Sequence, residues 1–60
     1  MDEVFQKALE VLGSAEKAKS WLAASNQALG GFSPDGLAQS PEGIQAVLQV
    51  LGRIEHGIFN

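Results

Sequence analysis

The sequence predicts an all-α fold: a small compact bundle of three main helices and one short helix, with the long helix at the C-terminal end. Apolar residues recur at steps of three and four, and no segment alternates convincingly with the period of two that strands show. Glycine, serine and proline stand where helix ends are expected. We therefore expect residues 1–60 to form a single domain whose helices are joined by tight turns.

The first helix is expected over residues 3–12. Gly13 follows it as a terminator, and Ser14 is placed to cap the next helix, so the two helices should meet at a sharp angle. Its apolar face is formed by Val4, Phe5, Ala8, Val11 and Leu12.

The second helix is expected over residues 15–24, with Ala15, Ala18, Trp21 and Leu22 on its buried side. Alanine side chains allow another helix to approach closely, and the large indole of Trp21 would then fill the widest gap. The helix–turn–helix arrangement of these first two helices resembles a DNA-binding motif, but the second helix offers only two lysines and one nearby glutamine as contacts.

An irregular stretch and a short helix connect these helices to the last one. Gly30 and Gly31 interrupt helical structure. Leu29 and Phe32 lie on either side of them and are expected to attach this loop to the core. Ser33 then caps a short helix that begins at Pro34 and is anchored by Leu37.

The long helix is expected to begin after its cap Ser40, with Pro41 first, and to run almost to the C-terminus. Gly57 stands where a left-handed C-cap is needed. The apolar stripe of this helix is Ile44, Val47, Leu48, Leu51, Ile54 and Ile58. Across the chain, the predicted core comprises Phe5, Trp21, Leu22, Leu29, Leu37, Val47, Leu51 and Ile54.

Two glycines inside the long helix, Gly43 and Gly52, call for a structural reason because glycine destabilises a helix interior. One interpretation is that each permits close approach of another helix within the fold. The other is that Gly52 admits a backbone or side chain of a partner. Phe59, next to the C-terminal residue, has the same two alternatives: it closes the fold or anchors a partner.

Composition excludes several classes of function. The chain has no cysteine and one histidine, so neither a thiolate metal site nor a catalytic nucleophile–base pair is expected, and no cofactor is implied. Four basic residues and a net charge of −3 disfavour nucleic-acid binding by this chain alone. No apolar run has membrane-spanning length and no signal peptide is evident, which together with the missing cysteines favours a cytoplasmic protein. Because no catalytic nucleophile–base pair is visible, we expect that the protein is not an enzyme.

The order and spacing of several motifs resemble the toxin-binding domain of Xre/MbcA/ParS-type antitoxins. The matching positions are Val4-Phe5, Ala18, Trp21-Leu22, Asn26, Leu29-Gly30-Gly31, Pro34, Leu37, Glu42-Gly43, Val47 and the run from Leu51 to Phe59, Leu-Gly-Arg-Ile-Glu-His-Gly-Ile-Phe. The resemblance covers essentially the whole chain. Family members usually carry a helix–turn–helix DNA-binding domain ahead of this one, which we do not find here.

The resemblance implies an antitoxin module of a type II toxin–antitoxin system. Its expected partner is a RES-domain toxin, which consumes NAD+ or uses it for ADP-ribosylation, and the antitoxin neutralises it by blocking access to the active site. The resemblance places toxin binding on the C-terminal helix, at Gly52, Arg53, Glu55, His56, Gly57 and Phe59. The planar guanidinium of Arg53 suits an acidic or polar group on the toxin.

The alternative function is a helical module for homo-oligomerisation of a transcriptional regulator. The small size of the chain favours it, because a domain of this length buries too little surface to be very stable alone. Together, Val50 and Leu48 would also extend the apolar surface of the last helix beyond one stripe. A homodimer is compatible with either function.

Overall fold

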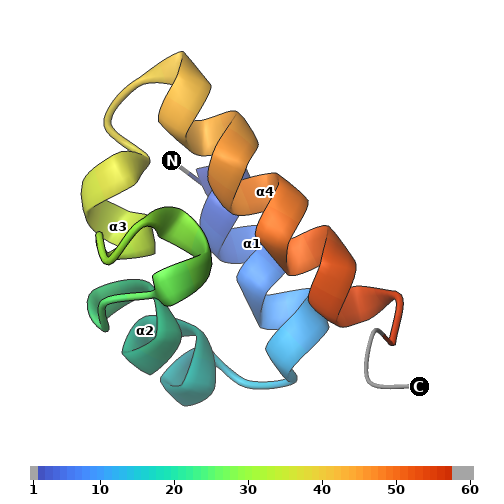
Figure 1. Cartoon of the computed structure of the whole chain (residues 1–60). Coiled ribbons are helices and arrows are strands. Elements are labelled where there is room, and N and C mark those ends of the chain that lie inside the picture. The colour runs from blue at the N-terminus through green and yellow to red at the C-terminus, as the bar shows by residue number, and fades with distance from the viewer. Residues whose placement is uncertain (1, 58–60) are drawn as a thin grey trace.

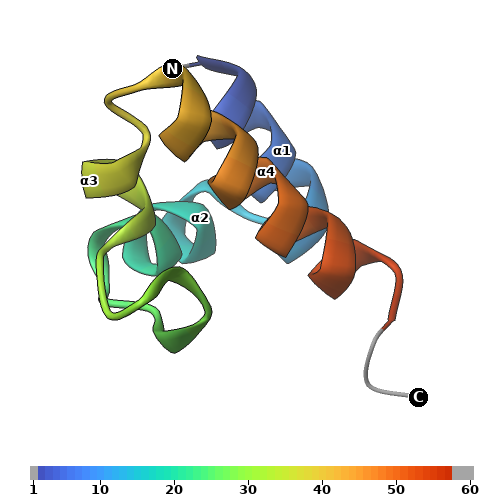
Figure 2. The ribbon, with the colours of Figure 1, turned by 45° about the horizontal axis from the view of Figure 1, so that its top comes forward.

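The computed structural model describes residues 2–57, and all regular structure in that range is helical (Figure 1). The helices are α1 (Asp2–Leu12), α2 (Ala15–Ala23), α3 (Pro34–Leu37) and α4 (Pro41–Glu55), with a 3-10 turn, η1 (Gln27–Leu29), before α3. The predicted all-α fold, with three main helices, one short one and the longest last, is confirmed. Figures 1 and 2 show α4 lying against α1, while α2 and α3 lie to one side of this pair.

Serine caps begin three of the helices. The side-chain oxygens of Ser14, Ser33 and Ser40 each accept a backbone N–H three residues later, at 3.2, 3.1 and 3.1 Å respectively. These bonds satisfy amide groups that have no partner inside the helix, and each cap is worth about 1 kcal/mol. All three caps were expected from the sequence, because the capping signal is local.

The loop between α2 and α3 is more regular than the sequence indicated. The side-chain oxygen of Asn26 accepts the amide of Ala28 at 2.9 Å and so caps η1. Gly30 and Gly31 follow with φ of 73° and 89°, which is the left-handed region that favours glycine. Leu29 is buried and attaches the loop to the core.

The core lies where α1, α2, η1 and α4 meet. Its buried apolar residues are Val4, Ala8, Ala18, Leu22, Leu29, Val47 and Leu51. Pro34, the first residue of α3, is fully buried as well. Val47 and Leu51 are one turn apart, so they lie on the same face of α4, and this face packs against the rest of the molecule.

Three expectations about the core are wrong, and two of them concern residues that are exposed. Phe32 is 62% exposed, because its ring lies over the Gly30 turn: a Cβ on Gly30 would be 3.8 Å from Cδ2 of Phe32. Ala15 is exposed because it is the first residue of α2, immediately after the turn where α1 ends.

Other predicted core residues occupy the margin of the core. Phe5, Trp21 and Leu37 are partly buried and pack against the core cluster. The prediction that Ile54 belongs to the core is wrong. It lies on the same side of α4 as Leu51 but is only partly buried and outside the core cluster, whose last residue in α4 is Leu51. Buried packing therefore holds α4 as far as Leu51 but extends little into its last turn.

Gly43 is a point of close approach within the fold. A Cβ at this position would lie only 1.6 Å from the carbonyl oxygen of Leu37, an impossible contact with backbone at the end of α3. The interpretation of Gly43 as a packing glycine is confirmed. The absence of a side chain lets the first turn of α4 pass directly against α3.

We expect Gly43→Ala to lower the free energy of unfolding by about 1–3 kcal/mol, because α3 and α4 must move apart to admit the methyl group. Urea unfolding followed by circular dichroism measures the change. Gly52→Ala is the matched control, since a Cβ there meets no atom within 4 Å, and it should raise stability by about 0.5–1 kcal/mol. Equal effects of the two substitutions would contradict this account.

Candidate functional site

The outer side of α4 carries a shallow open hollow lined by Gln49, Gly52, Arg53 and His56. We call these four residues the outer face of α4. They are spaced by three, four and seven positions, so they share one side of the helix, opposite Val47 and Leu51. Three of them were singled out from the sequence. Gln49 was missed, although it lies one turn before Arg53 and the same spacing would have found it.

Gly52 lines this hollow without a side chain. A Cβ at Gly52 would have no atom within 4 Å, so close packing inside the fold is not the reason for this glycine. The first interpretation of the two helix glycines therefore fails at Gly52. Without a side chain here, the helix backbone between Gln49 and Arg53 is accessible to another molecule.

The last turn of α4 ends in a left-handed glycine, as expected. The amide of His56 donates to the carbonyl oxygen of Gly52 at 3.0 Å, and the amide of Gly57 donates to that of Ile54 at 3.2 Å. Gly57 has φ of 68°, which turns the chain out of the helix. The helix therefore ends at Glu55, earlier than the sequence suggested, and the expected roles of Ile58 and Phe59 lie outside the described residues.

Arg53 and His56 are both exposed, so their polar groups are accessible on the outer face. Neither side chain takes part in an ion pair within residues 3–57. Arg53 provides five N–H donors in a planar arrangement that matches a carboxylate. The outer face is thus a donor-rich surface on a protein whose net charge is −3.

Glu55, which the resemblance places among the toxin-binding residues, also has a partner within the fold. Its Oε1 lies 2.6 Å from Nζ of Lys7, so an ion pair joins the end of α4 to α1. This hydrogen bond lowers the pKa of Glu55 below its ordinary value of 4.5 and raises the pKa of Lys7 above 10.5. Sequence reasoning missed the pair because its members are 48 positions apart.

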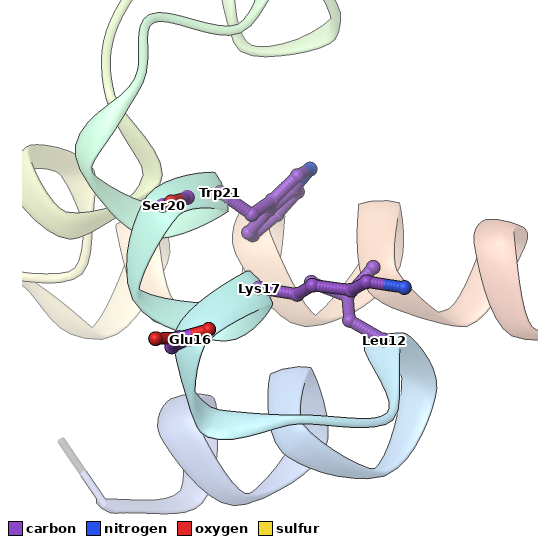
Figure 3. Close-up of a pocket in the computed structure, with 5 residues that line it drawn as sticks. All are labelled: Leu12, Glu16, Lys17, Ser20 and Trp21. Carbon is purple, nitrogen blue, oxygen red and sulfur yellow. The ribbon is translucent and has the colours of Figure 1, made fainter.

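A second open hollow lies over the turn between α1 and α2 (Figure 3). It is lined by Leu12, Glu16, Lys17, Ser20 and Trp21. Trp21, expected to fill a gap between helices, packs against the core cluster but is only partly buried, and it also lines this hollow together with Lys17. The hollow combines apolar groups with one acidic and one basic side chain. It contains no residue of the outer face of α4.

The described part of the chain shows neither a cluster of metal ligands nor a membrane-spanning helix. Residues 3–57 contain no group of three or more histidine, cysteine, aspartate or glutamate side chains arranged to hold a metal ion. Over the same range, none of the helices combines the length and apolar character required to cross a membrane.

Comparison with known proteins identifies the family. Residues 7–57 match the family described as antitoxin Xre/MbcA/ParS C-terminal toxin-binding domain. The chain belongs to this family. It is also 34% identical over 58 residues to the protein named Antitoxin Xre from Yersinia enterocolitica serotype O:8 / biotype 1B. No solved structure matches the chain.

The chain is much shorter than this relative. The alignment spans 95% of the chain and 39% of the Yersinia antitoxin. The Xre/MbcA/ParS match runs from Lys7 in α1 to Gly57 after α4, so it includes the outer face and both members of the ion pair. The resemblance noted from sequence motifs is thereby confirmed at the level of the family.

The Lys7–Glu55 pair should make the stability of this toxin-binding domain depend on pH. The contribution of Glu55 is present above its unfolded pKa of 4.5 and is lost as the pH falls through the lower folded pKa. That of Lys7 is present below 10.5 and is lost as the pH rises through the higher folded pKa.

We therefore expect the stability difference between the wild type and Glu55→Gln to be constant from about pH 5 to pH 10 and to shrink on both sides. Urea unfolding at a series of pH values measures it, with Glu42→Gln, a glutamate of α4 that is not paired with Lys7, as the control. A difference that persists unchanged well below pH 4 would contradict the assignment.

Proposed function

We propose that this chain is the toxin-binding module of a type II antitoxin and that it neutralises a RES-type toxin. The toxin would consume NAD+ or use it for ADP-ribosylation, and the bound module would block access to its active site. Membership of the antitoxin family supports binding of a toxin. The observation that carries the placement of the site is the open, side-chain-free surface at Gly52, flanked by two exposed donor residues.

The mechanism that we propose is occlusion by the C-terminal end of α4. The backbone at Gly52 allows a toxin loop to approach the helix more closely than any other residue type would permit. Arg53 supplies charge-assisted hydrogen bonds to an acidic or polar group on that loop, and His56 adds a further contact. We include Gly57 and Phe59 in this proposal because the family motif contains them. The positive φ of Gly57 ends the helix at this point.

Gly52 gives this proposal a distinctive energetic feature. A glycine inside a helix lowers stability by about 0.5–1 kcal/mol relative to alanine, and nothing within the fold requires it here. A surface that a partner covers closely supplies a reason to retain it. Binding of the toxin would stabilise the folded module by mass action and offset this cost.

The test is NAD+ consumption by a RES-domain toxin encoded beside this gene, titrated with the whole chain. We expect a stoichiometric fall to zero. Arg53→Glu and Gly52→Ala should each raise the concentration needed for half-inhibition by about tenfold or more. Arg53→Glu reverses a charge at the proposed interface, and Gly52→Ala fills the space above the helix backbone. The double variant Arg53→Glu/Phe59→Ala should be weaker still.

Lys19→Glu is the matched control for Arg53→Glu. It makes the same change in charge at an exposed position of α2 that lines neither hollow, so inhibition should be unaffected. Gly52→Ala carries its own internal control, since it should bind less well while unfolding at higher urea. If the folded chain leaves NAD+ consumption unchanged, the RES assignment is wrong. If inhibition occurs but survives both single substitutions, the site lies elsewhere.

The hollow beside Trp21 favours a second candidate function, homo-oligomerisation. Partly buried Trp21 and Leu12 supply apolar surface there, and Glu16 and Lys17 supply one charge of each sign, which a second copy can match. Sedimentation equilibrium should then show a dimer that Trp21→Ala weakens. A strict monomer at millimolar concentration would eliminate this function and leave the antitoxin proposal standing.

A further inference from the structure

The last turn of α4, residues 52–55, has few apolar contacts with the rest of the molecule. The buried line of α4 ends at Leu51, and Ile54 lies outside the core cluster. Gly52, at the start of this turn, contributes no side chain and lowers its intrinsic helix propensity. A terminal turn with these properties should fray readily.

The Lys7–Glu55 ion pair is positioned to prevent that fraying. Glu55 is the last residue of α4, and Lys7 lies in the middle of α1 between the buried residues Val4 and Ala8. The bond of 2.6 Å therefore attaches the end of one helix to a well-anchored part of another. The two side chains are 31% and 42% exposed, so the pair lies at the surface and does not itself belong to the core.

The same turn determines how the outer face is presented. The amide of His56 donates to the carbonyl oxygen of Gly52, so opening of this turn would displace His56 and rotate Arg53. A surface already held in its binding geometry loses less conformational entropy when a partner binds. The order of this turn and the affinity of the outer face are thus coupled.

We propose that Lys7 is a positioning residue for partner binding: through its ion pair with Glu55 it holds the last turn of α4 in the binding geometry, and neither side chain needs to contact the partner. This inference deepens the proposed function and rests on it. It assigns a role to a residue of α1 that the C-terminal motif does not include. It also changes the role of Glu55 from a direct contact to one half of a structural pair.

Exchanging the two charges distinguishes these roles. We would compare Lys7→Glu, Glu55→Lys and the double variant Lys7→Glu/Glu55→Lys for inhibition of the RES-domain toxin. Each single variant places like charges together, and the double variant restores an ion pair of opposite polarity. We expect inhibition to weaken by about three- to tenfold in each single variant and to return to within about twofold of wild type in the double variant.

Two controls separate positioning from other effects. Lys19→Glu changes the charge of the chain as Lys7→Glu does and should leave inhibition unchanged. Hydrogen exchange at the amide of His56, measured on the free chain, reports the order of the last turn without any toxin. Exchange should accelerate in both single variants and slow again in the double variant.

The outcomes decide the proposal. If the double variant inhibits as poorly as Glu55→Lys while its exchange is restored, Glu55 contacts the toxin directly and the positioning role is overturned. Unchanged exchange in Lys7→Glu would show that the ion pair does not order the turn, which also overturns it. If the wild type does not inhibit the toxin, the proposed function fails, and the exchange data alone still decide whether Lys7 holds the end of α4.

Discussion

Gly43, Val47 and Leu51 form the buried line of α4, and their packing sets the rotation of this helix about its own axis. Val47 and Leu51 have no exposed surface, and the missing side chain of Gly43 allows contact with the carbonyl of Leu37 at the end of α3. Once this line faces α1 and α3, helical geometry directs Gly52, Arg53 and His56 outward. The candidate binding surface is therefore a consequence of core packing on the opposite side of the same helix.

The two ends of α4 are held by different kinds of interaction. At the first turn, the Ser40 cap and the contact between Gly43 and α3 hold the backbone at short range. At the last turn, apolar contacts are sparse and a surface ion pair connects the helix to α1. Surface pairs of this type contribute little to global stability, but they can order a segment that otherwise frays. Such an arrangement suits the binding surface that we propose at the end of α4.

The two glycines of α4 illustrate why one residue type can serve opposite purposes. Replacing Gly43 would force two helices apart, whereas replacing Gly52 meets only open space. The first glycine contributes to the fold, and the second weakens the helix without any benefit inside the domain. In a chain of 60 residues, where the core is small, a destabilising residue on an exposed face is informative about binding.

Local features were determined by the sequence alone. Three serine caps, the left-handed Gly57 and the short helix at Pro34 could be predicted, because each depends on residues close together in the chain. The family could be predicted from the order and spacing of motifs along the whole chain. Three residues of the outer face, Gly52, Arg53 and His56, were named through the family resemblance, and the helix of the structure places them on one side of α4.

The tertiary structure decided those features that depend on which residues of different helices lie opposite each other. Four features depend on neighbours from other segments. They are the exposure of Phe32, the partial burial of Trp21, the difference between Gly43 and Gly52, and the Lys7–Glu55 pair. Hydrophobic periodicity shows which side of a helix is buried, but it does not show which residues of another helix lie opposite. Contacts such as the one between Lys7 and Glu55 arise only when packing brings distant parts of the chain together.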